Sequence, residues 1–133
     1  MFTTVLEDLA ALLRGAGLNA SLDAVDVSPP GVVIRADAIL PASAKMCGDY
    51  PIRSSLWLVV PDTTTLAAYR ALDELYARVL PALAGSGTTP TVDDRVFERL
   101  VMPDNSSALP ALRLSVITLV PANLPAPTGR TTP

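Results

Sequence analysis

Few residues in this chain have the chemistry of a catalytic or metal site. The 133 residues include no histidine and one cysteine, Cys47. Histidine is the commonest general base and the commonest zinc ligand in proteins. A cysteine nucleophile needs a base that forms its thiolate, and the sequence marks no such base. We therefore interpret Cys47 as a buried or edge thiol that forms no disulfide within the chain.

Two close carboxylate pairs remain as candidate ligands for a divalent ion, Asp23/Asp26 and Asp93/Asp94. Both lie beside expected ends of secondary-structure elements, where aspartate side chains cap helices and turns. No serine lies in a Gly-x-Ser-x-Gly elbow, and the Gly-Ser-Gly at 85–87 lacks the Gly-Lys-Ser/Thr that defines a phosphate loop. We predict that the protein is not an enzyme and binds no cofactor and no metal.

The element that organises the chain is residues 53–60. Apolar side chains occupy both alternating faces of this stretch, which is typical of a central strand in a covered sheet. They are Leu56, Trp57, Leu58, Val59 and Val60. Pro61 ends the strand, and Asp62 or one of the three following threonines is placed to cap a helix.

That helix is predicted to run to about Leu83. One face of it is apolar and is expected to pack on the sheet, and the opposite face carries charges at four-residue spacing. The apolar residues are Tyr69, Leu72, Tyr76, Val79 and Leu83, and the charged ones are Arg70, Glu74 and Arg78. Pro81 predicts a kink or an end in the last turn because it lacks an N–H group.

The N-terminal third predicts a helix from about Thr4 to Ala16, with a capping box of Thr4 and Glu7 and a left-handed stop supplied by Gly15 and Gly17. Residues 22–27 form either a strand in a hairpin or a loop. A Ser-Pro-Pro-Gly turn at 28–31 follows. Residues 32–40 then predict a half-exposed strand with one apolar face.

The rest of the chain predicts loops and a hairpin. Residues 41–51 and 88–94 lack a sustained period and are expected to be loops. Residues 95–102 fit a short helix or a strand, and we choose the strand because a turn at 103–107 and an apolar strand at 112–120 complete a hairpin. The predicted fold is one α+β domain, with a mixed, mostly antiparallel sheet of four to five strands and two main helices packed against it.

Composition indicates a protein that buries surface against other chains. Half of the residues are apolar and 17% are charged, below the roughly 25% of soluble domains. A plain, rather apolar monomer is the alternative. The net charge of -3 and the single lysine, Lys45, argue against a protein that holds nucleic acid by its phosphates.

No apolar run approaches the roughly 18–20 residues of a membrane span. The first apolar run contains Glu7 and Asp8, unlike a signal peptide. We expect a soluble protein of the host cytoplasm or a virion.

The order of these elements resembles the tail terminator proteins of long-tailed (siphovirus-type) phages, particularly those that infect actinobacteria. The resemblance spans about residues 3–120. It depends on length, element order and short strings such as Pro-Pro-Gly-Val-Val-Ile at 29–34, Leu-Trp-Leu-Val-Val-Pro at 56–61 and Leu-Pro-Ala-Leu-Arg-Leu-Ser-Val at 109–116.

The resemblance implies a virion structural protein. Six copies would form a ring that caps the tail tube, ends its polymerisation and joins it to the connector on the head side of the neck. The implied partners are further copies of the chain, the tail tube protein and the head-side connector or stopper protein. DNA would pass through the ring without specific binding, and acidic side chains in the lumen would avoid holding its phosphates.

We divide the chain into a terminator-like domain, residues 1–120, and a Pro/Thr-rich C-terminal arm, residues 121–133. We expect the arm and the loop at 41–51 to contact neighbouring subunits. The candidate interface residues are Lys45, Met46, Cys47, Tyr50, Arg53, Pro121, Leu124 and Pro125. The alternatives are another neck ring protein, such as the head-tail stopper or an adaptor, and a small cytoplasmic ligand-binding domain or enzyme.

Overall fold

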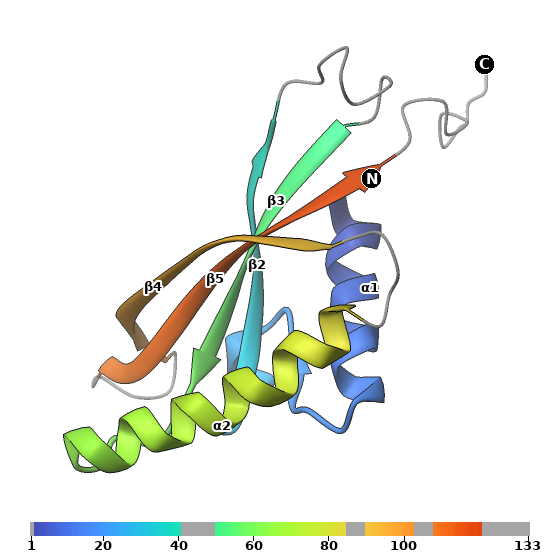
Figure 1. Cartoon of the computed structure of the whole chain (residues 1–133). Helices are drawn as coiled ribbons and strands as arrows, with labels where there is room; N and C mark the ends of the chain where they lie inside the picture. The colour runs from blue at the N-terminus through green and yellow to red at the C-terminus, as the bar shows by residue number, and fades with distance from the viewer. Residues whose placement is uncertain (1, 41–49, 85–89, 103–107, 121–133) are drawn as a thin grey trace, which may run out of the picture.

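Five strands form one mixed sheet in the order β1-β2-β3-β5-β4, within the residues 2–40, 50–84, 90–102 and 108–120 that the computed structural model describes (Figure 1). The pair β1/β2 is parallel and the other neighbours are antiparallel. In chain order the elements are α1 (Phe2–Gly15), β1 (Ala20–Ser21), the 3-10 helix η1 (Ala24–Asp26), β2 (Gly31–Ile39), β3 (Tyr50–Val59), α2 (Thr65–Ala84), β4 (Thr91–Val101) and β5 (Ala108–Val120). The predicted fold class, a single α+β domain with two helices contacting the sheet, is confirmed.

The predicted central strand is β3, which lies in the middle of the sheet between β2 and β5. Leu56 pairs with Ile34 on one side and with Leu114 on the other. All three side chains are 1% exposed or less. The apolar character of residues 53–60 therefore follows from a position that is covered by neighbours on every side.

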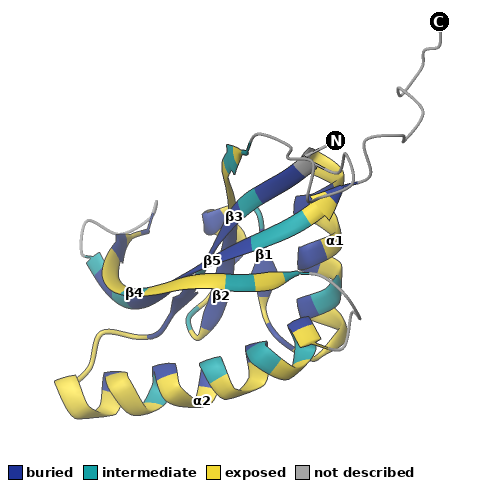
Figure 2. Cartoon of the chain, turned by 45° about the horizontal axis from the view of Figure 1, so that its top comes forward, coloured by how far each residue is buried: buried dark blue, intermediate teal, exposed yellow. Residues whose placement is uncertain are grey.

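Both α-helices cover the same face of the sheet, and most of the core lies between them and the sheet (Figures 1 and 2). Alternate residues of β3 and β5 supply this core because successive strand side chains point to opposite faces. The strand residues in it are Val32, Ile34, Ile52, Leu56, Leu58, Leu112, Leu114, Val116 and Val120. A second, smaller cluster covers one end of the other face, where Ala24 and Val27 pack near Val33, Val59 and Met102.

The N-terminal segment differs from its predicted form in three places. The helix α1 begins at Phe2, so Thr4 lies inside its first turn and the capping box at Thr4 is wrong. Of the two glycines predicted to supply the left-handed stop, Gly17 does so with a φ of 84°, whereas Gly15 is the last residue of α1. Residues 22–27 form no hairpin strand: the short β1 precedes them, and Asp23 accepts a hydrogen bond from Val25 N at 3.3 Å and caps η1.

The helix α2 confirms the predicted strand-to-helix connection. Among the candidate caps the structure uses Thr64, whose Oγ1 accepts a hydrogen bond from Ala67 N at 3.4 Å. The predicted extent to about Leu83 is confirmed, since α2 ends at Ala84. Of the two outcomes predicted at Pro81, a kink or an end, the end is wrong because the helix continues through this residue. Pro81 lies on the exposed side of the helix, where water can bind the carbonyl group that the missing N–H leaves free.

The strand chosen for residues 95–102 is confirmed, and both strands of the hairpin are longer than predicted. The strand β4 begins at Thr91, within the expected linker, and β5 begins at Ala108. The loop predicted at 41–51 is wrong at its last two residues, because β3 already begins at Tyr50. The rest of that loop, the turn at 103–107 and the arm at 121–133 lie outside the described residues. In the described part of the chain, no helix is both long and apolar enough to cross a bilayer.

Candidate functional site

The structure places two of the eight predicted interface residues. Arg53 lies on β3, on the face away from the helices, with Nη1 3.9 Å from Asp37 Oδ2. Tyr50 is the first residue of β3 and pairs with Val120 in the register of the sheet. The other six are Lys45, Met46, Cys47, Pro121, Leu124 and Pro125, and they lie outside the described residues.

The face of the sheet away from α1 and α2 has a tryptophan between two arginines at its centre. The Arg35 guanidinium lies 6.0 Å from the Trp57 ring centroid, and that of Arg113 lies 5.8 Å from it. Trp57 pairs with Arg113 on β5 and with Val33 on β2, two residues before Arg35. We call this surface the open face and define it by Arg35, Arg53, Ser55, Trp57, Arg113, Ser115 and Ile117.

The arginines of the open face are partly neutralised by carboxylates. Arg113 donates from Nη2 to Glu98 Oε1 on the edge strand β4 at 3.1 Å. Arg53 faces Asp37 at the bulge in β2. Surface pairs of this kind contribute little to stability. The pair with Glu98 holds the Arg113 guanidinium beside Trp57. Together with Arg35 this gives an amphipathic patch of the composition found in protein interfaces.

A second surface lies on the opposite side of the sheet, between α2 and β4. Tyr69 and Phe97 are 53% and 63% exposed, and their rings meet edge to face with centroids 5.6 Å apart. They separate two hollows of about 580 and 320 Å³. We call this surface the α2/β4 groove and define it by Tyr69, Leu72, Tyr76, Arg95, Phe97 and Leu112.

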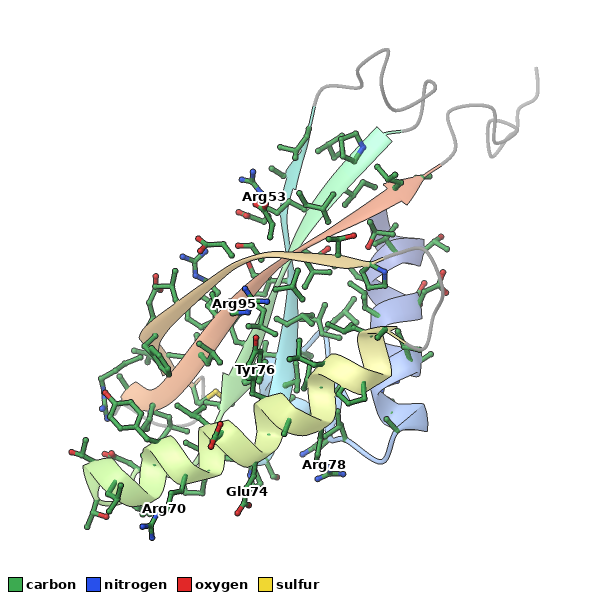
Figure 3. The ribbon with its side chains drawn as sticks, viewed as in Figure 1. Arg53, Arg70, Glu74, Tyr76, Arg78 and Arg95 are labelled. Atoms are coloured by element: carbon green, nitrogen blue, oxygen red, sulfur yellow. The ribbon has the colours of Figure 1, made fainter. Side chains whose placement is uncertain are left out.

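Polar contacts hold the two walls of the α2/β4 groove together. Arg95 Nε donates to the Tyr76 hydroxyl, and the Arg95 guanidinium lies 6.0 Å from the Tyr76 ring centroid. Figure 3 shows Tyr76 pointing from α2 toward Arg95. At the other end of the groove, Arg99 donates from Nη2 to Asp62 Oδ1 at 3.2 Å and to Ala108 O at 2.6 Å.

The predicted apolar face of α2 is only partly correct. Leu72, Val79 and Leu83 are buried, whereas Tyr69 is exposed and contacts an aromatic residue that is 28 positions away in the chain. The charged side chains Arg70, Glu74 and Arg78 point away from the sheet, as predicted (Figure 3). Arg78 also donates to Gly17 O at 3.1 Å, which ties α2 to the end of α1.

The carboxylate pairs have structural partners. Asp23 caps η1, as predicted for an aspartate at the end of a secondary-structure element. Asp93 and Asp94 lie inside β4 and not at an element end, and Asp94 Oδ1 accepts from Arg95 N at 2.8 Å beside the bulge. Within the described ranges, no three histidine, cysteine or carboxylate side chains gather to form a metal site.

Sequence reasoning missed the aromatic residues of both surfaces. It placed Trp57 in a strand with two covered faces and Tyr69 against the sheet. The signal that identifies them is the pairing register, which sets Trp57 beside Arg113 and Phe97 beside Leu112. Neither a scan against protein-family models nor a search of curated proteins found a match to this chain.

Proposed function

We propose that this protein is a ring subunit that caps the tail tube of a long-tailed phage, ends tube polymerisation and joins the tail to the neck. The observation that carries the proposal is the pair of unlike surfaces on opposite sides of one sheet, the open face and the α2/β4 groove. A closed ring is built from head-to-tail contacts, so each subunit needs two different surfaces that complement each other. A symmetric dimer needs only one.

The chemistry of the two surfaces supports this role. The open face offers a tryptophan and arginines, and the groove offers exposed aromatic rings; tryptophan, tyrosine and arginine are the residues most enriched at interface hot spots. The larger hollow of the groove is lined mainly by apolar and aromatic side chains. The smaller hollow is lined by polar residues as well, among them Asp62, Glu98 and Arg99.

The proposed ring also constrains where the open face lies. Arg35, Arg53 and Arg113 project from it, and exposed arginines in a lumen would bind the passing DNA backbone. We therefore place the open face between subunits or against the tube. Acidic residues elsewhere would line the lumen.

The test is to delete the gene from a phage that carries it and to examine the lysate by electron microscopy. Overlong, uncapped tails beside filled heads are the expected result. Tails of normal length separated from leaking heads would assign the protein to the head-side stopper instead. Intact, infectious virions would overturn the structural role.

A further inference from the structure

We infer that the α2/β4 groove of one copy binds the C-terminal arm, residues 121–133, of a second copy. This inference shares the α2/β4 groove with the proposed function but does not depend on tail termination. It names the occupant of one surface and applies to any assembly of this chain.

The composition of the arm matches the composition of the groove. Residues 121–127 read Pro-Ala-Asn-Leu-Pro-Ala-Pro and contain no charge. Proline-rich segments bind aromatic-lined grooves because they lose little entropy on binding and present apolar ridges to the rings. Tyr69 and Phe97 present such rings, and both are more than half exposed.

One charge at the groove is opposite in sign to the arm. The one charged side chain of the arm is Arg130. The carboxylate of Asp73 is exposed on α2 and lines the larger hollow together with Arg70 and Arg95. Tyr69 and Phe97 contact each other, so we place Leu124 against the exposed sides of the two rings and not between them.

The chain length keeps Leu124 away from the aromatic rings of its own groove. Phe97 pairs with Leu112, which precedes the end of β5 at Val120 by eight residues, or roughly 26 Å along the strand. Leu124 follows Val120 by four residues and reaches at most about 14 Å from it. The chain leaves β5 beside the first turn of α1, at the far end of the sheet from the start of α2 (Figure 1). Leu124 therefore reaches the Tyr69 and Phe97 rings only on another copy.

The experiment is disulfide trapping between two full-length chains of different size, both carrying Cys47→Ser. One chain carries Leu124→Cys and the other carries Phe97→Cys. The matched control replaces Phe97→Cys with Val25→Cys, since Val25 has a similar exposure of 59% against 63% for Phe97 but lies on η1, outside the groove.

The expected result is a mixed disulfide dimer that forms with Phe97→Cys at least about tenfold faster than with Val25→Cys. Equal rates in the two mixtures would overturn the inference. So would a crosslink that forms only within one chain when both cysteines are placed together, because that result would assign the arm to its own groove.

A second measurement does not depend on the cysteine variants. A labelled peptide of residues 121–133 is titrated with the full chain carrying Leu124→Asp, whose own arm no longer competes. We expect Phe97→Ala to weaken peptide binding about tenfold, the effect of one hot-spot side chain. Binding that is unchanged by Phe97→Ala, or no binding at all, would refute the groove as the site. Tail-length phenotypes test tail termination alone, so failure of either proposal is recognised separately.

Discussion

The two faces of β3 and β5 should respond very differently to the loss of an aliphatic side chain. Leu56 is 0% exposed, packs under the helices and lies between Ile34 and Leu114. Leu→Ala changes at such sites cost about 2–5 kcal/mol, with the upper part of the range where the surroundings do not collapse. A central strand held on both sides cannot shift into the cavity, so we expect Leu56→Ala to lower the free energy of unfolding by about 3–4 kcal/mol.

The matched variant is Ile117→Ala on the open face. Ile117 is half-buried, and its register neighbours are Arg53 and Thr91. Its side chain already contacts water, so the transfer and cavity terms are both small and we expect a loss of about 1 kcal/mol.

Urea denaturation measures both losses, with the fluorescence of Trp57, the one tryptophan of the chain, as one probe and far-UV circular dichroism as the other. With a denaturant slope of about 2 kcal/mol per M, the midpoint should fall by about 1.5–2 M for Leu56→Ala and by about 0.5 M for Ile117→Ala. Coincident curves from the two probes would justify the two-state treatment. Equal losses in the two variants would show that the assignment of covered and open faces is wrong.

Three further substitutions test local features by the same urea titration. Ser54→Ala should cause no loss and a gain of up to about 1 kcal/mol, because Ser54 is 0% exposed and its Oγ has no hydrogen-bond partner among the described residues. Thr64→Ala should cost about 0.5–1 kcal/mol through the lost cap of α2, and Thr64→Ser should restore most of it. Gly31→Ala should cost about 1–3 kcal/mol, because a Cβ there would lie 2.5 Å from Val27 Cγ1 and 2.9 Å from Asn19 O; a neutral result would mean that η1 moves away freely.

The central part of the fold was predictable because local and global preferences agree there. Residues 56–60 are apolar on both faces; the helices cover one face, and the cluster around η1 covers the other face at Val59 but leaves Trp57 partly exposed. Pro61 and the threonines that follow separate this strand from α2, as capping chemistry predicts. A strand and a helix whose apolar faces pack against each other are readily recognised from the spacing of their apolar residues.

The short elements were not predictable, since their conformation depends on distant contacts. The strand β1 has two residues and exists because Ala20 and Ser21 pair with Val32 and Val33. The 3-10 helix η1 buries Ala24 against the second cluster. The alternation in residues 22–27 fits a strand equally well, and only the packing partner decides between the two.

The open face and the α2/β4 groove could not be predicted from the sequence for a related reason. An exposed aromatic residue and a core aromatic residue have the same sequence signature, and Tyr69 lies at a position on α2 where the apolar period predicts burial. Its exposure results from the position of β4, which places Phe97 and not a covering element next to it. Both rings remain more than half exposed at the wall of a groove.

In our inference, the candidate interface residues of the arm and the α2/β4 groove are the two sides of one contact between subunits. Composition selected Leu124 and Pro125 as apolar residues that nothing in the arm itself can bury. The sheet register selected Phe97 and Tyr69 as rings that nothing in the described part of the chain covers. Because Leu124 is too close to the end of β5 to reach the rings of its own groove, pairing these halves requires a second subunit. Since that contact joins unlike surfaces, each added copy leaves one arm and one groove free, and the series ends only when a ring closes.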